Sequence, residues 1–446
     1  MTSTSRVTSA LAAVALTSLC LPCISLAGTP DESFARAVRN GDKAAARALL
    51  ASRADPNRQL PDGSTPLAWA VESQDREMVR LLLDHGAKPR DGDVASLTPL
   101  VVACQYGDPA ILDMLITAGA NVKVASGNDI TPLSVCAGNA PVAILERMIV
   151  AGAEVDPADA KGQTPLMWAA AKGRVDNIQL LLEHGALVNR KTEQGFTPLF
   201  FALKSGEPRA PVAVLAAGGD ADHVAPDGTS VVQLAMYQKA YDFAALMIER
   251  GANLTAFDRN GNQLLHAAVL ADQPALVGLL LANGANANAL TGTSKVKMRF
   301  EVNFKTGDYE VPAKPPLLLA AESGSAVVMR LLVDAGANTK YRSGDGTNVL
   351  HAAVTSGKLA ALQLALQLEP DANTKTSNGH TPLHLLLGSN AGAETAAMMK
   401  LLADQGARTD IGDRAGRTPT DFATEAQTDM KTAFEAAFAN RTAGKL

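Results

Sequence analysis

Histidines are the residues of this chain best suited to proton transfer or metal binding, and seven occur among its 446 residues. A cluster of them would indicate catalysis or a zinc site, because imidazole titrates near neutral pH and commonly binds zinc. Five of them instead recur at two fixed places in a repeated pattern. His266, His351 and His384 follow the first residue of a predicted helix by two positions, whereas His85 and His184 precede a glycine that ends one. This placement favours structural roles, which for the second pair include a favourable charge at a helix C-terminus.

The two remaining histidines, His223 and His380, lie in predicted loops. His380 and His384 are four residues apart, but a helix begins at Thr381 and Pro382 between them, so their rings do not share a helical face. They therefore do not predict a metal site. The chain also lacks the G-x-S-x-G, H-E-x-x-H, P-loop and dinucleotide-binding patterns of common enzymes. We predict no enzyme activity, no metal and no cofactor.

The element that positions these residues is a helix-turn-helix unit, seen most clearly in residues 161–189, KGQTPLMWAAAKGRVDNIQLLLEHGALVN. Thr164 is placed to cap a helix that begins at Pro165, where the missing N–H costs nothing. Gly173 ends this first helix and Gly185 ends a second one, since glycine adopts the left-handed conformation without strain. A unit this short cannot bury enough apolar surface to fold alone, so it requires stacked copies.

Copies of the unit recur every 33 residues. The position of the first helical residue is held by Pro66, Pro99, Pro132, Pro165, Pro198, Val231, Leu264 and, after a 52-residue step, by Pro316, Val349, Pro382 and Pro419. The glycine that ends the second helix follows the same period, at Gly86, Gly119, Gly152, Gly185, Gly218, Gly251, Gly284, Gly336 and Gly406.

This period, the Thr-Pro-Leu openings, the three histidines after them and the Leu-Leu-Leu-x-x-Gly-Ala endings resemble the ankyrin repeat family over roughly residues 31–438. The resemblance implies an all-α solenoid of about twelve stacked helix-turn-helix repeats. It also implies that His266, His351 and His384 tie backbone groups of neighbouring finger loops, the segments that join one repeat to the next. Protein partners would contact the finger tips and the concave ends of the first helices.

The pattern predicts the following organisation. Residues 1–27 form a signal peptide, 31–60 an N-terminal capping repeat, 61–289 repeats two to eight, 290–314 an inserted β-hairpin, 315–416 repeats nine to eleven, and 417–446 a C-terminal capping repeat and tail. Pro208 and Pro211 predict that the second helix of repeat six begins late, around Val212. Trp69 and Trp168 occupy equivalent positions and are predicted to belong to the core between repeats.

Two cysteines, Cys104 and Cys136, lie on the predicted first helices of adjacent repeats. Stacked helices lie about 8–10 Å apart, whereas a disulfide needs Cα atoms within about 7 Å. We therefore predict two buried free thiols. The other two cysteines, Cys20 and Cys23, fall within the signal peptide and leave with it.

Residues 1–27 have the pattern of a secretory signal peptide. Arg6 supplies the positive charge, residues 11–26 are apolar, and residues 25–27 fit a cleavage site. The apolar run is short for a membrane span, so we predict none after cleavage. Two weaker alternatives remain, an uncleaved anchor and a lipoprotein formed through Cys20 or Cys23. The leader predicts a periplasmic or secreted bacterial protein.

The 52-residue step leaves 19 extra residues in one finger loop. Residues 295–304 alternate strictly, which predicts a strand; 306–308 predict a turn and 309–311 a return strand. The apolar face carries Val296, Met298, Phe300, Val302 and Phe304. An exposed stripe of this kind needs a cover, which is either the protein's own finger loops or a partner, including a second copy of this chain.

The sequence predicts a protein-binding scaffold or accessory subunit of the bacterial cell envelope whose partner is a protein of unknown identity. The formal charge of −5 argues against a nucleic-acid partner. The candidate binding residues are Tyr106, Phe196, Tyr237, Lys295, Lys297, Arg299, Phe300 and Tyr309. Aromatic side chains anchor interfaces, and basic ones attract acidic surfaces. Three alternatives remain open: a homodimer through the hairpin, an exported effector acting on a host protein, and an enzyme with a site near the hairpin.

Overall fold

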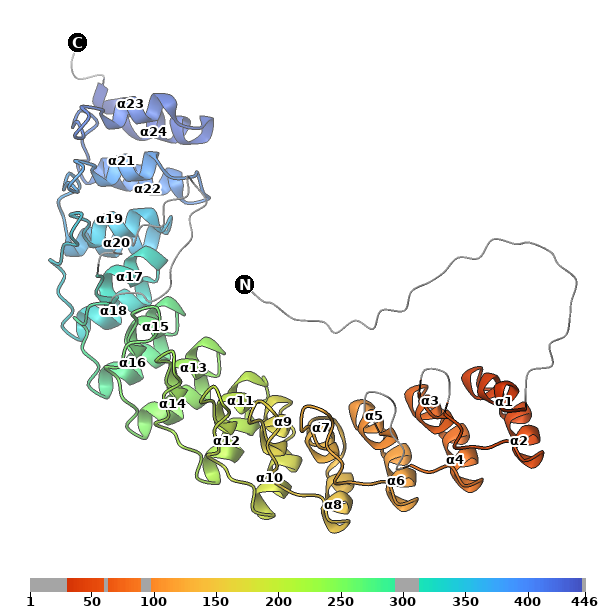
Figure 1. Cartoon of the computed structure of the whole chain (residues 1–446). Coiled ribbons are helices and arrows are strands. Elements are labelled where there is room, and N and C mark those ends of the chain that lie inside the picture. Colours follow the sequence, from red (N-terminus) through yellow and green to blue (C-terminus); the bar gives the residue numbers. More distant parts are fainter. Residues whose placement is uncertain (1–29, 60–62, 90–97, 293–312, 443–446) are drawn as a thin grey trace, which may run out of the picture.

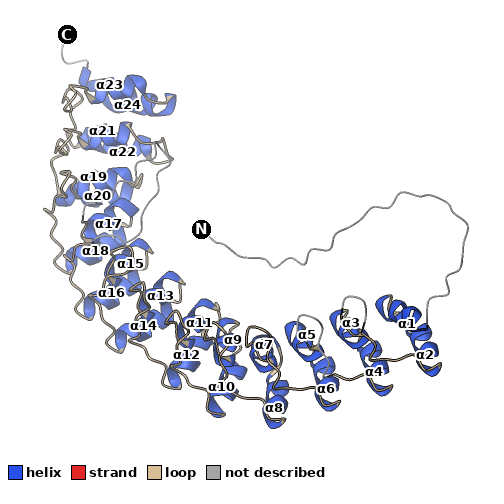
Figure 2. Ribbon diagram, viewed as in Figure 1, coloured by secondary structure: helices blue, strands red, loops and turns tan. Residues whose placement is uncertain are grey.

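The protein folds as a curved row of helix pairs (Figure 1). The computed structural model describes residues 30–59, 63–89, 98–292 and 313–442, and this part of the chain contains 24 helices. Figure 2 shows helices and loops throughout that part. None of its helices has the length and apolar character needed to cross a bilayer.

The odd-numbered helices are the first of each repeat, and from α1 to α17 they lie along the inside of the arc (Figure 1). They are α1 Pro30–Arg39, α3 Pro66–Glu72, α5 Pro99–Tyr106, α7 Pro132–Asn139, α9 Pro165–Ala171, α11 Pro198–Lys204, α13 Val231–Tyr237, α15 Leu264–Leu270, α17 Pro316–Ser323, α19 Val349–Thr355, α21 Pro382–Leu387 and α23 Pro419–Glu425.

The even-numbered helices are the second of each repeat, and from α2 to α18 they form the outer layer (Figure 1). They are α2 Lys43–Ala51, α4 Arg76–Asp84, α6 Pro109–Thr117, α8 Val142–Val150, α10 Val175–Glu183, α12 Arg209–Ala216, α14 Tyr241–Glu249, α16 Pro274–Ala282, α18 Ala326–Asp334, α20 Leu359–Leu368, α22 Thr395–Asp404 and α24 Thr428–Thr442. We number the repeats one to twelve by these pairs. The predicted helical solenoid is confirmed.

The helix ends follow the predicted capping chemistry. Thr164 accepts a hydrogen bond from the Met167 backbone N–H at the start of α9, and Pro165 is the first helical residue. After α10, Gly185 has a φ of +90°, the left-handed conformation that ends the helix. The same features recur along the array, so one local pattern sets the boundaries of most helices.

Helix α12 begins earlier than predicted, at Arg209 rather than around Val212. Pro208 is the N-cap residue, and Pro211 lies in the first turn of the helix. The N–H groups of the first turn have no carbonyl partner within a helix. A proline there therefore removes no hydrogen bond, and the prediction was wrong because it placed Pro211 before the helix rather than in its first turn.

One hydrophobic core runs through the described array, built from leucine, alanine and valine side chains of successive repeats. Trp69 and Trp168 pack against this core but are only half-buried, so they lie at its edge rather than within it. The Arg39 guanidinium lies 4.1 Å from the centroid of the Trp69 ring, a favourable cation–π distance.

A disulfide joins Cys104 of α5 to Cys136 of α7, so the prediction of free thiols was wrong. The two Cα atoms are 4.5 Å apart. The 8–10 Å stacking distance separates helix axes. Because Cα atoms lie on a cylinder of about 2.3 Å radius, facing Cα atoms of stacked helices approach to about 4–5 Å. Ala103 and Ala137, the neighbours of these cysteines in the sequence, are small and fully buried, which suits such close packing.

The predicted signal peptide, residues 1–27, and the predicted strands and turn of the hairpin, residues 295–311, lie outside the described residues. The two ends of the insertion are described and are joined to each other. The Thr291 backbone N–H donates to the Lys314 carbonyl oxygen at 3.1 Å, and the Lys314 N–H donates to the Thr291 hydroxyl oxygen at 3.0 Å. The inserted chain therefore leaves and re-enters the finger row at one point.

Candidate protein-binding surface

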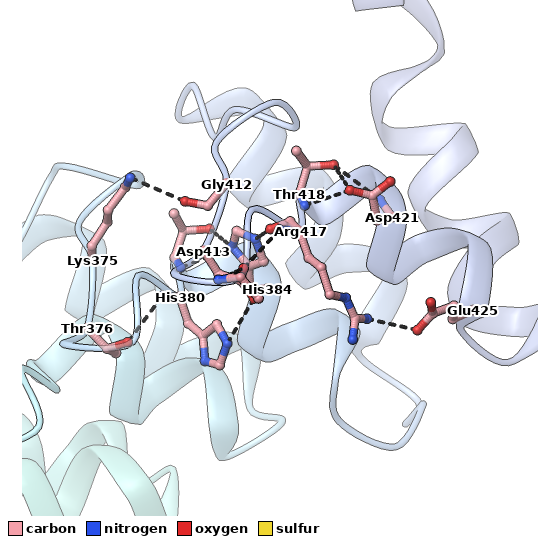
Figure 3. A network of polar contacts seen from close by, with 12 residues as sticks. Lys375, Thr376, His380, His384, Gly412, Asp413, Arg417, Thr418, Asp421 and Glu425 are labelled. Atoms are coloured by element: carbon pink, nitrogen blue, oxygen red, sulfur yellow. Dashed lines mark hydrogen bonds and ion pairs between the residues drawn. The ribbon is translucent and has the colours of Figure 1, made fainter.

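His384 ties its own helix, α21, to the finger loop that follows (Figure 3). Its Nδ1 atom accepts a hydrogen bond from the Thr381 backbone N–H at 3.1 Å, and its Nε2–H donates to the Arg417 carbonyl oxygen at 3.1 Å. The backbone donor at Nδ1 assigns the proton to Nε2. Both ring nitrogens are thus engaged, which leaves neither for a metal ion or for proton transfer.

His266 and His351 make the same pair of bonds. In His266, Nδ1 accepts from the Gln263 backbone N–H at 3.2 Å, and Nε2–H donates to the Ala289 carbonyl oxygen at 3.0 Å. In His351, Nδ1 accepts from the Asn348 backbone N–H at 3.3 Å, and Nε2–H donates to the Thr374 carbonyl oxygen at 3.1 Å. Burial lowers the pKa of all three histidines, to about 4 for His351, because desolvation disfavours imidazolium. All three are therefore neutral at pH 7, and their predicted role as ties between finger loops is confirmed.

Gln233 is a fourth tie, which the sequence interpretation missed. Its Oε1 accepts from the Ser230 backbone N–H at 2.8 Å, and its Nε2 donates to the Ala256 carbonyl oxygen at 3.0 Å. A carboxamide reproduces both bonds because it carries an acceptor and a donor, like neutral imidazole. The signal was available in the sequence, since Gln233 precedes His266 by one 33-residue period.

The ties are unevenly distributed. In repeats two to six and nine the equivalent position is held by Ala68, Val101, Ser134, Met167, Phe200 and Leu318. Ser134 bonds only within its own repeat, to the Thr131 hydroxyl at 2.9 Å. The side-chain ties at this position therefore belong to repeats seven, eight, ten and eleven.

His380 lies beside the last tie, in the finger loop before α21 (Figure 3). Its Nε2 is 3.5 Å from Asp413 Oδ2, and its ring centroid is 5.8 Å from that of His384. The Phe422 ring meets both imidazoles edge-on, and the Arg417 guanidinium lies 4.3 Å from its centroid. This cluster joins repeat eleven to repeat twelve. Across the described ranges, no group of three or more His, Cys, Asp or Glu side chains is arranged to hold a metal ion.

The predicted binding residues do not converge on one place. Tyr106, at the end of α5, is 53% exposed, and Tyr237, at the end of α13, is 39% exposed and accepts a hydrogen bond from the Asn260 side chain at 3.3 Å. Phe196 is half-buried, with its ring 5.8 Å from that of Phe200, so it packs locally. The remaining candidates, Lys295, Lys297, Arg299, Phe300 and Tyr309, lie outside the described residues.

Three exposed apolar residues, Val224, Phe257 and Leu290, were not singled out from the sequence. They occupy the same position in three consecutive finger loops, 33 residues apart, and are 50%, 48% and 43% exposed. We name this set the apolar finger stripe. The sequence does indicate this stripe, because apolar residues recur at the 33-residue period at a position in the loops rather than in the helices.

These features define a helical-repeat scaffold: one elongated core, polar ties that hold loops, and a long surface of loops and helix ends. A family model of three ankyrin repeats matches residues 34–126, 133–215 and 317–394, which together make up more than half of the chain. The chain belongs to the ankyrin repeat family. Ankyrin repeats are protein-interaction modules, so the chain is a protein–protein interaction scaffold, and members of this family are generally not enzymes.

Curated relatives match this chain over part of its length. The human ankyrin repeat and SOCS box protein 16 is 30% identical over 227 residues, which cover 45% of this chain and 48% of that protein. The transient receptor potential cation channel subfamily A member 1 of Drosophila melanogaster is 30% identical over 171 residues, 35% of this chain and 13% of the channel. The mouse B-cell lymphoma 3 protein homolog is 31% identical over 176 residues, which cover 34% of this chain and 38% of that protein. The matched segment spans less than half of each relative.

Proposed function

We propose that the protein is an exported scaffold of the bacterial cell envelope that holds a protein partner on its finger loops and first helices. The observation that carries the scaffold role is the repeat array itself. It offers a long, regular surface, whereas both ring nitrogens of His266, His351 and His384 are engaged by backbone groups. Such solenoids use their extended surfaces for binding.

Two independent features support export. The first 27 residues have the charge, apolar run and cleavage pattern of a signal peptide. Outside that segment only two cysteines remain, and they form a buried disulfide. Disulfides persist in oxidising compartments and are rare in the cytosol. Both features favour the periplasm or the extracellular space.

Fractionation combined with affinity capture tests this proposal. A C-terminally tagged chain, expressed in a Gram-negative host, should appear in the periplasmic fraction without the leader and with no free thiol. A matched control, Leu16→Arg, interrupts the apolar run of the leader and should leave the chain in the cytosol. Recovery of the wild-type chain in the cytosol, with its leader and four free thiols, would contradict export. Recovery in the culture medium would favour the exported effector.

The wild-type mature protein, immobilised in a periplasmic extract, should retain a partner that mass spectrometry identifies. The matched bait is an unrelated ankyrin array of similar length, which removes proteins that bind any such solenoid. Failure to retain any protein above this control, from extracts of cells grown in several conditions, would contradict the scaffold role in the envelope.

A further inference from the structure

Exposed apolar side chains are concentrated in one part of the array. Ten large hydrophobic side chains are exposed across the described residues, and five of them belong to repeats seven and eight and the finger loops beside them. Three form the apolar finger stripe, and the other two, Tyr237 and Leu270, end the first helices α13 and α15. Scattered apolar residues on a surface need no explanation, but a cluster of this kind marks a contact site.

The central residue of the stripe is held in place by its surroundings. A Cβ atom on Gly292 would lie 3.2 Å from the Phe257 ring, so the absence of a side chain there lets the ring lie against the next finger loop. The Gly292 backbone N–H donates to the Gly261 carbonyl oxygen at 2.7 Å, which joins these two loops. In the finger loop that precedes the loop of Phe257, Val224 pairs through its backbone with Ser230. A pre-ordered surface of this kind loses little conformational entropy on binding.

The ends of the stripe carry positive charge at the same loop position. One repeat before Val224 the position is held by Lys191, and after Leu290 it is held by Arg342 and then Lys375. All three are exposed. Arg342 lies 3.8 Å from Glu369, and Lys375 donates to the Gly412 carbonyl oxygen at 3.5 Å (Figure 3). Along the finger row, the sequence of surfaces is therefore cationic, apolar and cationic.

We propose that the apolar finger stripe binds an extended segment of a partner protein that is apolar at its centre and acidic at both ends. This inference rests on the proposed scaffold function and names the surface and the chemistry of its partner. At about 10 Å per repeat, the stripe is about 20 Å long, which an extended segment of about six residues spans. The flanking cations extend the site to about twelve residues and select acidic ends by charge complementarity.

A second copy of this chain fits the stripe less well. A two-fold dimer places the stripes antiparallel, because its interface is isologous. Lys191 of one copy then meets Arg342 of the other at both ends. Like charges that face each other across an interface cost free energy. The charge order thus favours an acidic partner over self-association.

Two peptides of about twelve residues test the proposal by fluorescence anisotropy with the full mature chain. Both contain the same central Val-Leu-Phe-Val-Leu-Phe, flanked by glutamates in one and by lysines in the other. The glutamate peptide should bind roughly tenfold more tightly, and this preference should fall as salt is added. Equal binding of the two peptides, or binding of neither at millimolar concentration, would overturn the proposal.

The stripe variant combines Val224→Ser, Phe257→Ser and Leu290→Ser. It should keep the wild-type melting temperature, since these side chains are half-exposed, and lose roughly tenfold or more in affinity for the glutamate peptide. The matched control combines Val150→Ser, Leu187→Ser and Val327→Ser, which are 82%, 59% and 62% exposed and lie outside the stripe, and it should bind like wild type. Equal affinity of the two triple variants would contradict the assignment of the site.

A second pair of measurements separates other occupants. If a variant in which a short Asp-Gly finger replaces residues 293–312 binds the peptide and the wild type does not, the occupant is the chain's own insertion and the proposal fails. A dimer of the wild type that the stripe variant abolishes would also refute it. Capture from the periplasmic extract distinguishes failure of the stripe proposal from failure of the scaffold function. A partner retained by both the wild type and the stripe variant upholds the scaffold function and rejects the stripe as its binding site. No partner retained by either rejects the function itself.

Discussion

The two halves of the array stack the same unit but join their repeats by different chemistry. In repeats two to six, the position two residues after the start of the first helix is apolar or small, and a disulfide joins repeats three and four. In repeats seven, eight, ten and eleven, a glutamine and three histidines at that position bond the next finger loop, whereas repeat nine has Leu318 there. A covalent bond responds to reductant and a buried imidazole responds to acid. The N-terminal half should therefore be redox-sensitive and the C-terminal half acid-sensitive.

The largest expected effect is the loss of stability of the C-terminal half in acid. Burial holds the pKa of His351 at about 4, below its ordinary value of 6.5, so the unfolded chain binds the proton more readily between these values. The free energy of unfolding is at its full value above pH 6.5 and declines as the pH falls towards 4. Protonation of His351 alone accounts for a loss on the order of 3 kcal/mol, and His266 and His384 act in the same direction. Urea denaturation at pH 7 and pH 4.5 measures this loss.

The chain supplies the matched control for this prediction. Gln233 makes the same two bonds without titrating, so the combined change His266→Gln, His351→Gln and His384→Gln should keep the fold at pH 7 and remove most of the loss above pH 4.5. An unchanged acid response of this variant would show that other groups carry it.

The next effect is the loss of the disulfide. The change Cys104→Ala with Cys136→Ala should destabilise repeats three and four by on the order of 3 kcal/mol, because the bond closes a loop of 32 residues in the unfolded chain. Reductant should lower the melting temperature of the wild type and leave the double variant unaffected. Two reactive thiols in the unfolded, unreduced wild type would refute the bond.

A smaller effect is expected from the glutamine tie. Gln233→Ala removes both bonds and leaves the Ser230 N–H and the Ala256 carbonyl without this partner, at a cost of about 1–2 kcal/mol. Gln233→His should restore most of the stability at pH 7 and add acid sensitivity to repeat seven. Denaturation at both pH values distinguishes the two variants, and acid-insensitive Gln233→His protein would show that the position does not define the tie.

The smallest effect concerns an asparagine in the finger loops. The Asn189 side chain donates to the Gly218 carbonyl oxygen at 2.9 Å and accepts from the Asp220 N–H at 2.7 Å, and both bonds are exposed to solvent. Asn189→Ala should cost about 1 kcal/mol. Asn288→Ala is the matched variant in the C-terminal half, where the same bonds reach Gly336 and Asn338. Equal losses would show that this tie, unlike the histidines, does not distinguish the halves.

The sequence predicted most of the fold because the repeat register fixes local chemistry. Thr164, Pro165 and Gly185 specify helix ends by themselves, and thirty-three-residue copies of them set the array. The disulfide was missed because the prediction applied the distance between helix axes to Cα atoms. The start of α12 was missed because the role of Pro211 depends on where the helix begins.

The candidate site was less predictable for two reasons. Gln233 was overlooked because the interpretation followed residue type, whereas the tie requires only an acceptor and a donor in the right geometry. Exposure of Val224, Phe257 and Leu290 depends on how the finger loops stack, which a one-dimensional pattern does not encode. Tyr106 and Tyr237 are exposed as a binding role requires, whereas Phe196 packs on Phe200.

Regional hydrogen exchange tests the account of two differently joined halves most directly. Exchange of the mature protein, corrected for the intrinsic effect of pH, is followed at pH 7 and pH 4.5, each with and without tris(2-carboxyethyl)phosphine. Acid should deprotect α15 and α19 to α23 and leave α5 to α9 protected, whereas the phosphine should deprotect α5 to α8 and leave the C-terminal helices unchanged. Uniform deprotection of the whole array by either treatment, or the reverse pattern, would contradict it.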